Sequence, residues 1–238
     1  MERLDDLQLS GLKILQDTER FCFGMDAVVL SGFIKVKKGA RLLDMGTGTG
    51  ILPLLLSAKT EASELVGLEI QEESAAMASR SVELNGLSEK IRIVRGDIKE
   101  AGKLFGPASF SVVCSNPPYM AAGQGLTNPD DPLAIARHEI LCSFEDIVKQ
   151  SFIVLRQGGS LFLVHKPERL SELFCTLSAG RMEPKRLRLV HPFADREPSM
   201  VLIEAVKDGK KGMKVEKPLI LYEKKDVYSE EMRRDYGF

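Results

Sequence analysis

Three glycines, Gly46, Gly48 and Gly50, alternate with threonines between an apolar segment that ends at Met45 and another that begins at Ile51. Glycine has no Cβ, so such a loop can turn sharply from a strand into a helix and bring its backbone close to a ligand. A dinucleotide-binding fingerprint requires its third glycine three residues after the second, and Ile51 occupies that position. The loop therefore predicts a strand–loop–helix ligand site and disfavours NAD.

Beyond this loop, strand-like and helix-like segments alternate along the chain. The helix-like segments begin at residue 51 and span residues 72–85, 144–155 and 167–179. The strand-like segments comprise residues 40–45, 65–70, 91–95, 110–114, 160–165, 187–190 and 200–206. The last two are joined by too few residues for a crossover helix, so they should pair antiparallel. The pattern predicts an α/β fold with a doubly wound, mostly parallel seven-stranded sheet that has an antiparallel last strand.

The overall composition is typical of a soluble globular protein. Of 238 residues, 44% are hydrophobic and 28% are charged, and the formal net charge is −1, which excludes a disordered chain and a chain coated with nucleic acid. An RNA-binding surface would therefore be a local patch. No uncharged run has membrane-spanning length, and the first residues are acidic, unlike a secretory signal. We expect a cytoplasmic protein that has no membrane contact.

The spacing of cysteines and histidines does not indicate a metal site. The four cysteines are widely separated, and so are the three histidines, namely Cys22, Cys114, Cys142, Cys175, His138, His165 and His191. Neither set has the paired spacing of zinc ligands. We expect no metal, buried reduced thiols, and histidines that are ordinary polar or core residues.

A second motif follows the strand-like segment 110–114 and consists of Asn116, Pro117, Pro118 and Tyr119. The Asn116 side-chain carbonyl and the Pro117 backbone carbonyl can each accept a hydrogen from a planar amino group, which turns its nitrogen lone pair toward an incoming methyl group. The prolines stiffen the loop, and the Tyr119 ring can stack on a base. Alone, such a sequence is most often a turn. At the carboxyl end of a strand, where open α/β sheets bind ligands, it predicts methyl transfer onto planar nitrogen.

Acidic residues stand at the C-terminal ends of three successive strand-like segments. Asp44 precedes the glycine loop by two residues, Glu69 ends the second strand, and Asp97 follows the third. Glu69 stands where acids accept ribose hydroxyls in nucleotide sites, and Asp44 can face a cationic group of a ligand. Each acid also has an ordinary interpretation, as a turn residue, an exposed strand end and a helix N-cap, respectively. The three together predict a nucleotide-like cofactor at the carboxyl edge of the sheet.

This set of motifs resembles class I S-adenosylmethionine-dependent methyltransferases, and it is similar to the bacterial tRNA1(Val) adenine-N6-methyltransferase family over nearly the full chain. The resemblance implies a class I methyltransferase (Rossmann-like) fold, S-adenosylmethionine as the cofactor, and methylation of the adenine beside the anticodon of a valine tRNA. It implies that Asn116, Pro117, Pro118 and Tyr119 are catalytic. It assigns cofactor binding to Gly24, Asp26, Asp44, Met45, Gly46, Thr47, Gly48, Gly50, Glu69, Ile70, Asp97, Ile98 and Asn116. In this family Asp97 would recognise the adenine ring of the cofactor, and residues 24–26 would close over the cofactor.

The resemblance further implies one methyltransferase domain over residues 1–238, with a cofactor-capping segment 1–38, a core 39–208 and a tail 209–238. Residues 120–137, rich in Gly, Asn, Pro and Asp, are expected to form a lid. Basic residues beside the last two strands are either an RNA contact or a solvated surface, namely Lys185, Arg186, Arg188, Lys207, Lys210, Lys211, Lys214 and Lys217.

Other acceptors and another class of protein stay open. The Asn-Pro-Pro-Tyr motif also occurs in protein-glutamine N5-methyltransferases, where the two acceptors would hold a side-chain amide, and another RNA would serve equally. Those glutamine enzymes usually carry a separate N-terminal helical domain, and only about forty residues precede the first strand here. A non-catalytic RNA-binding module is the alternative from another class, and the intact Asn116, Pro117 and Tyr119 argue against it.

Overall fold

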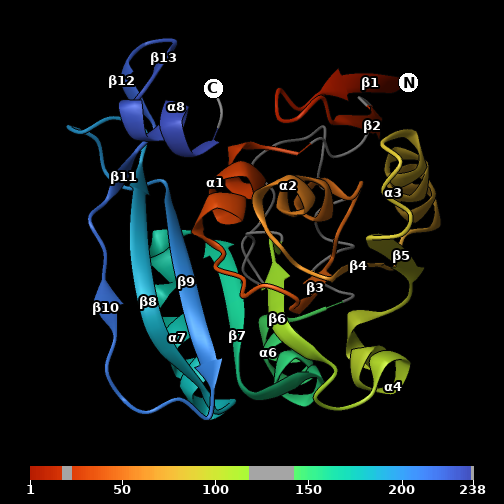
Figure 1. Cartoon of the computed structure of the whole chain (residues 1–238). Helices are drawn as coiled ribbons and strands as arrows, with labels where there is room; N and C mark the ends of the chain where they lie inside the picture. The colour runs from red at the N-terminus through yellow and green to blue at the C-terminus, as the bar shows by residue number, and fades with distance from the viewer. Residues whose placement is uncertain (18–22, 118–141, 237–238) are drawn as a thin grey trace, which may run out of the picture.

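A central sheet separates two layers of helices (Figure 1). The computed structural model describes residues 1–17, 23–117 and 142–236. Within them the main sheet has nine strands in the order β10, β8, β9, β7, β6, β3, β4, β5, with β11 also paired to β8. Its seven long strands are β3 Arg41–Met45, β4 Glu64–Glu69, β5 Ile91–Arg95, β6 Phe110–Ser115, β7 Leu155–His165, β8 Met182–His191 and β9 Met200–Lys207.

The directions of these strands confirm the predicted topology. Neighbours from β5 to β7 pair in parallel, whereas β9 pairs antiparallel with both β7 and β8. The described sheet is wider than the seven strands predicted. Two short strands, β10 Lys214–Val215 and β11 Leu219–Ile220, extend it by pairing in parallel with β8.

Helices cover both faces of the sheet, as a doubly wound fold requires. One layer contains α1 Met25–Phe33, α2 Ile51–Lys59 and α3 Glu72–Leu84, and the other contains α4 Ala101–Phe105, α6 Phe144–Val154 and α7 Leu170–Ala179. Short 3-10 turns, Ile98–Glu100 and Pro167–Arg169, precede α4 and α7. Successive residues of a strand face opposite layers, so Leu42 joins the core of α1 and α2 while Leu43 joins that of α6. Both are fully buried, which explains the continuous apolar runs in the sequence.

A hairpin at the N-terminus, absent from the sequence-based prediction, packs on α3. Its strands are β1 Glu2–Asp6 and β2 Lys13–Asp17. The Asn85 side chain accepts from the Lys13 backbone N–H at 2.9 Å and donates to the Lys13 carbonyl at 2.6 Å. The Leu15 N–H donates to the Ser81 hydroxyl at 2.9 Å. These bonds fix the segment that leads toward α1.

The C-terminal tail forms a second hairpin and a helix. The hairpin consists of β12 Tyr222–Lys224 and β13 Val227–Tyr228, and α8 Glu230–Tyr236 follows. The Tyr222 and Tyr228 rings stack with centroids 5.0 Å apart. Met232 of α8 is buried in the same apolar cluster as α1, so the tail packs against the first helix.

Several basic residues that the sequence offered as RNA contacts are engaged in the fold instead. Arg186 is 7% exposed, and its guanidinium binds Glu204 at 2.8 Å, Glu216 at 3.2 Å and the Phe33 carbonyl at 2.6 Å. Arg188 pairs with Glu231. Lys185 and Lys207 donate to backbone carbonyls. The exposed cations of this set are Lys210, Lys211, Lys214 and Lys217.

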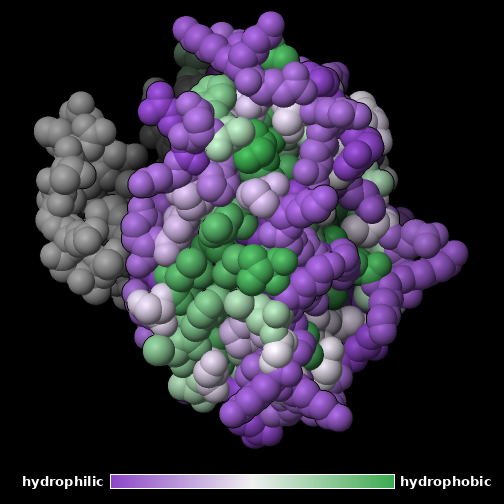
Figure 2. Space-filling view, turned by 90° about the vertical axis from the view of Figure 1, so that its left-hand side faces the viewer, coloured by the Kyte–Doolittle hydropathy of each residue, from purple (hydrophilic) through white to green (hydrophobic). Residues whose placement is uncertain are grey.

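The molecular face at the β8–β10 edge is mixed in character. Figure 2 shows hydrophilic side chains around an apolar area on this face. At the edge itself Met213 is 40% exposed and Val215 is 62% exposed. In the part of the chain that the structure describes, no helix is both long and apolar enough to cross a membrane.

The expectation of buried thiols is confirmed for one described cysteine. Cys114 is buried and Cys142 is partly buried, but Cys175 is exposed. Cys175 lies on α7 between Leu173 and Leu177, which face the sheet. Because helix faces repeat every three to four residues, Cys175 points to the other side, and the prediction of burial is wrong there. Cys22 lies outside the described residues.

Candidate active site

Four strand ends at one edge of the sheet bring the predicted polar residues together. Asp44 lies in β3, Glu69 ends β4, Asp97 follows β5, and Asn116 follows β6. These four strands are neighbours in the order β6, β3, β4, β5 and run parallel. Their carboxyl ends therefore meet at one edge, the position of ligand sites in open α/β sheets.

The glycine loop is fixed to the end of β4. The N–H groups of Gly46 and Thr47 both donate to the Leu68 carbonyl, at 2.9 and 3.0 Å. Gly46, Gly48 and Gly50 have φ values of 78°, 56° and 87°, a left-handed conformation that side-chain-bearing residues rarely adopt. A Cβ placed on Gly48 would meet no atom of the described residues within 4 Å. This side of the loop is open, so a ligand can lie directly against the backbone.

Glu69 is held by the backbone on both of its oxygens. It is 4% exposed, and its carboxylate accepts the Gly48 N–H at 2.8 Å and the Gln71 N–H at 2.9 Å. Each carboxylate oxygen has capacity for a further hydrogen bond. The loop thus sets the direction in which Glu69 can accept hydroxyl groups.

Asp44 is the most deeply buried acid of the site. It is 1% exposed, the Cys114 thiol lies 3.5 Å from its Oδ1, and its Oδ2 has no hydrogen-bond partner in the part of the chain that the structure describes. Burial raises its pKa to about 7, with a smaller contribution in the same direction from Glu69, while Thr47 and Cys114 oppose the shift. The Thr47 hydroxyl is close enough to act in this way but forms no hydrogen bond of normal geometry.

Gly67 is a residue of the site that sequence reasoning missed. It pairs with Asp44 across β3 and β4. A Cβ at this position would lie 2.8 Å from two side-chain atoms of Thr47 and 2.9 Å from Ile93. The missing side chain lets Thr47 pack over β4. A glycine inside an apolar strand signals such a close approach.

Asp97 and Ile98 follow β5, and Ile98 lies beside the glycine loop. The Asp97 carboxylate accepts the Lys99 N–H at 2.8 Å and so caps the short turn that begins at Ile98. The interpretation as an N-cap is therefore confirmed, although one oxygen can accept further bonds. The Ile98 side chain lies 3.8 Å from the position of a Cβ on Gly46. It offers an apolar surface beside the loop, and Ile70, after β4, is half-buried.

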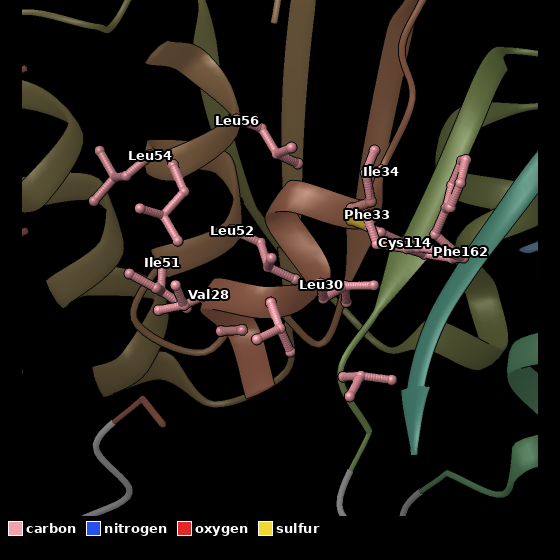
Figure 3. Close-up of a cluster of buried hydrophobic side chains, with 14 of the residues drawn as sticks. Val28, Leu30, Phe33, Ile34, Ile51, Leu52, Leu54, Leu56, Cys114 and Phe162 are labelled. Carbon is pink, nitrogen blue, oxygen red and sulfur yellow. The ribbon is translucent and has the colours of Figure 1, made fainter. Parts of the chain in front are cut away.

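The start of α1 lies next to the start of α2. Val28 and Ile51 belong to one apolar cluster and lie side by side in Figure 3. Gly24 precedes α1, and the Asp26 carboxylate in its first turn accepts the Ala27 N–H at 2.8 Å. Residues 24–26 are thereby placed near the helix that begins after Gly50.

The Asn116 motif begins where β6 ends. Asn116 is half-buried and Pro117 is buried, whereas Pro118, Tyr119 and the expected lid lie outside the described residues. Asn116 comes directly after β6, two residues beyond Cys114, which pairs with Asp44. The Ser115 hydroxyl donates to the Met45 carbonyl at 2.8 Å and joins this strand end to the glycine loop.

His165 ends β7, the next strand, and is an ordinary buried residue. It is 1% exposed, and its Nδ1 accepts the Lys166 N–H at 2.8 Å. Burial, reinforced by Arg169, lowers its pKa to about 4, so it is neutral at pH 7. His191 is half-buried, and His138 lies outside the described residues. Over the described ranges no group of His, Cys, Asp and Glu is arranged to hold a metal ion.

A cavity at the opposite edge of the sheet has no part in this site. It is lined by residues at the amino ends of β3, β4 and β5, including Arg41, Glu64 and Arg92. Arg41 and Arg92 both pair with Glu64, at 2.6 and 3.5 Å. Both of these arginines are therefore paired, unlike the oxygens at Asp44 and Thr47, which have no partner within the described residues.

The residues at the carboxyl edge fit S-adenosylmethionine. The unpartnered Asp44 Oδ2 can face its positive charge, Glu69 can accept ribose hydroxyls, and the open side of Gly48 leaves room for the ligand. This fold and this site define a class I S-adenosylmethionine-dependent methyltransferase. Residues 25–177 match the methyltransferase small domain family.

Relatives and solved structures agree with this class. The tRNA1(Val) (adenine(37)-N6)-methyltransferase of Tolumonas auensis is 30% identical over 189 residues, which cover 79% of this chain and 77% of the relative. A protein of the same name from Porphyromonas gingivalis is 30% identical over 68% of this chain and 64% of its own length. The chain belongs to the methyltransferase small domain family and, within it, to the tRNA1(Val) (adenine(37)-N6)-methyltransferase family.

The solved structures support the fold. A predicted O-methyltransferase from Agrobacterium tumefaciens superposes with a TM-score of 0.74 and 22% identity, over 90% of this chain and 96% of that one. A geranyl diphosphate methyltransferase in complex with S-adenosylmethionine has a TM-score of 0.58 and 14% identity, over 77% of this chain and 84% of that chain.

Proposed function

We propose that the protein methylates the exocyclic N6 amine of an adenine in tRNA, namely the adenine beside the anticodon of a valine tRNA. The observation that carries this proposal is the position of Asn116 at the end of β6, next to the strand that holds Asp44 and the glycine loop. The names of the relatives support tRNA as the substrate and adenine as the target.

Asn116 and Pro117 activate and orient the amine. An adenine amine is a poor nucleophile because its lone pair is delocalised into the ring. Two carbonyl acceptors, the Asn116 side chain and the Pro117 backbone, take its two hydrogens and favour a lone pair that points toward the methyl group. Pro117 is buried, and the Ser115 hydroxyl bond to Met45 holds the start of this segment, so the acceptors are preorganised.

The methyl donor supplies an electrophilic methyl group when bound, and the chain's own residues orient it. Asp44 would face its positively charged methionine end, and Glu69 would accept its ribose hydroxyls. Asp97 and Ile98 would hold its adenine ring, and Gly24 and Asp26, near the start of α2, would close over it. The target base must leave its stack to reach Asn116, and Tyr119 stays the predicted stacking partner.

We infer that residues 1–238 act as one methyltransferase unit, with a capping segment 1–38, a core 39–208 and a tail 209–238. The bond from Arg186 to the end of α1 and the burial of Met232 beside α1 support one unit, because they join the capping segment to the core and to the tail. We further infer that the protein acts in the cytoplasm, where its tRNA substrate is found.

Replacing Asn116 tests the proposal. Asn116→Ala removes one of the two acceptors, and we expect turnover to fall by about 100-fold or more. The dissociation constant for S-adenosylhomocysteine should stay within about twofold of the parent value, because the other contacts to the cofactor remain. The exposed Cys175→Ser variant is the control for both measurements. A loss of S-adenosylhomocysteine affinity at unchanged saturated turnover would contradict the role given to Asn116.

A further inference from the structure

The buried carboxyl group of Asp44 has fewer partners than such a group requires. Within the described residues, its Oδ1 receives one sulfur contact at 3.5 Å and its Oδ2 receives none, although the residue is 1% exposed. Buried carboxylates are normally satisfied by several hydrogen bonds, because an unsatisfied charge in an apolar interior is costly. The Oδ2 atom therefore indicates a donor that comes from a ligand.

The register of the sheet makes Cys114 the side chain that sets the position of this carboxyl group. Asp44 has two cross-strand partners, Gly67 on β4 and Cys114 on β6. Gly67 has no side chain, so the thiol is the cross-strand group that can donate to Asp44. A thiol is a weak donor, which holds Oδ1 without satisfying the whole group.

Within the described residues, the Cys114 thiol is the side-chain donor that meets Asp44 with hydrogen-bond geometry. Glu69 faces Asp44 from β4 with a like charge. The Thr47 hydroxyl is close enough to lower the pKa of Asp44, but it forms no hydrogen bond of normal geometry within the described residues. The cluster around Cys114 is apolar, with Phe33 of α1 and Phe162 of β7 close to it in Figure 3. Burial and the adjacent Asp44 raise the pKa of the thiol, so it stays protonated and remains a donor.

We propose that Cys114 is a positioning residue for the methyl donor, because its thiol holds Oδ1 of Asp44 and leaves Oδ2 to bind the cationic methionine end of S-adenosylmethionine. The inference rests on the proposed role of Asp44 and deepens it. Cys114 acts only through Asp44, since its sulfur lies in the apolar core below the site.

Cofactor binding should consequently depend on pH. Asp44 must be ionised to bind a cation, and its pKa of about 7 leaves it largely neutral at pH 6. Apparent affinity scales with the competent fraction, so binding should strengthen about tenfold between pH 6 and pH 8. Cys114→Val removes the donor and shifts this rise to higher pH. Cys114→Ser supplies a stronger donor and shifts it to lower pH.

Calorimetry with S-adenosylmethionine over this pH range tests the proposal. At pH 7 we expect about three- to tenfold weaker binding for Cys114→Val, with recovery in Cys114→Ser. The KM for S-adenosylmethionine should rise in parallel, while kcat at saturation and the KM for tRNA stay unchanged. Cys175→Ser controls for loss of a thiol, and thermal unfolding of each variant confirms that it is folded at the assay temperature.

The variants separate two kinds of failure. Equal affinity and an equal pH profile in Cys114→Val, Cys114→Ser and the parent would overturn the role of Cys114. If Asp44→Asn also binds S-adenosylmethionine as the parent does, the proposed role of Asp44 fails as well. If Asp44→Asn weakens binding and the Cys114 variants do not, only the inference about Cys114 is wrong.

Discussion

Asp44 carries a proton in the folded protein at pH values where the unfolded chain has lost it. Burial raises its pKa from an ordinary 3.8 to about 7, so folding is favoured below pH 4 and this contribution is lost as the pH rises through 7. The shift corresponds to roughly 4 kcal/mol at most. Ionised Asp44 therefore lowers the free energy of unfolding, and a bound cationic ligand offsets this loss.

We therefore predict that Asp44→Asn flattens the pH dependence of stability. Without cofactor, the variant should become more stable relative to the parent as the pH rises from 4 to 8, because the amide cannot ionise. Urea unfolding at several pH values measures this difference. Asp226→Asn changes an exposed acid of the β12–β13 turn and should show no such trend. Parallel curves for parent and Asp44→Asn would contradict the burial argument.

The sequence predicted the acids and the glycines of the site but not the residues beside Asp44 on the neighbouring strands. Asp44, Glu69 and Asp97 each stand at the C-terminal end of a predicted strand, and the structure brings them to one edge. Gly67 and Cys114 act through the register of three strands, which places both beside Asp44. Register depends on long-range pairing, and a single sequence does not specify it.

Among the elements, α1 depends on a distant residue for its position. Arg186 of β8 donates to the Phe33 carbonyl at the end of α1, stacks over the Phe33 ring at 4.0 Å, and pairs with Glu204 of β9. Removing one partner of a buried ion pair leaves the other charge uncompensated. This arrangement connects the helix that carries Asp26 to the antiparallel edge of the sheet.

Arg186→Gln should accordingly lower the free energy of unfolding by about 3 kcal/mol. Denaturant unfolding measures the change, and Lys210→Gln, an exposed cation near the same edge, should leave stability within about 0.5 kcal/mol. An unchanged unfolding midpoint together with weaker tRNA binding would restore the original interpretation of Arg186 as a phosphate contact.

The predicted elements differ from the observed ones mainly where strands are short. The seven long strands and the helices α2, α3, α6 and α7 follow clear apolar patterns and are confirmed. β10 and β11 contain two residues each, too few for any alternation to be recognised. The β1–β2 hairpin is largely exposed on β1, so its sequence lacks the apolar alternation of a buried strand. Ser10 and Gly11 lie in its turn and both have positive φ. The Ser-Gly pair is the sequence signal that could have located the hairpin.

For the molecule as a whole, cofactor binding should be measurable as added stability. A ligand at 100 times its dissociation constant stabilises the folded state by about 2.7 kcal/mol, which for a chain of this size is roughly 5–10 °C in Tm. We expect S-adenosylhomocysteine to give this shift and NAD to give none. Glu69→Ala, which loses the acceptor for the ribose, should show a smaller shift. A shift with NAD alone would contradict the assignment of the cofactor.

The RNA-binding face is the part of the molecule that the sequence predicts least well. The net charge of −1 already limits it to a patch, and four of the eight basic residues first considered are tied to the fold. Lys210 and Lys211 follow β9 at its carboxyl end. Because β9 runs antiparallel to β7, they lie at the sheet edge opposite to Asn116. The direction of β9, rather than the composition of the chain, determines at which edge these two lysines lie.

Identifying the methylated atom distinguishes an adenine in tRNA from the other acceptors. Labelled S-adenosylmethionine is incubated with the protein and, separately, with total tRNA and with a protein extract, and the products are digested and identified by mass spectrometry. We predict N6-methyladenosine beside the anticodon of a valine tRNA, and its disappearance with Asn116→Ala. Label on a glutamine amide of a protein, or on another atom of tRNA, would contradict the account.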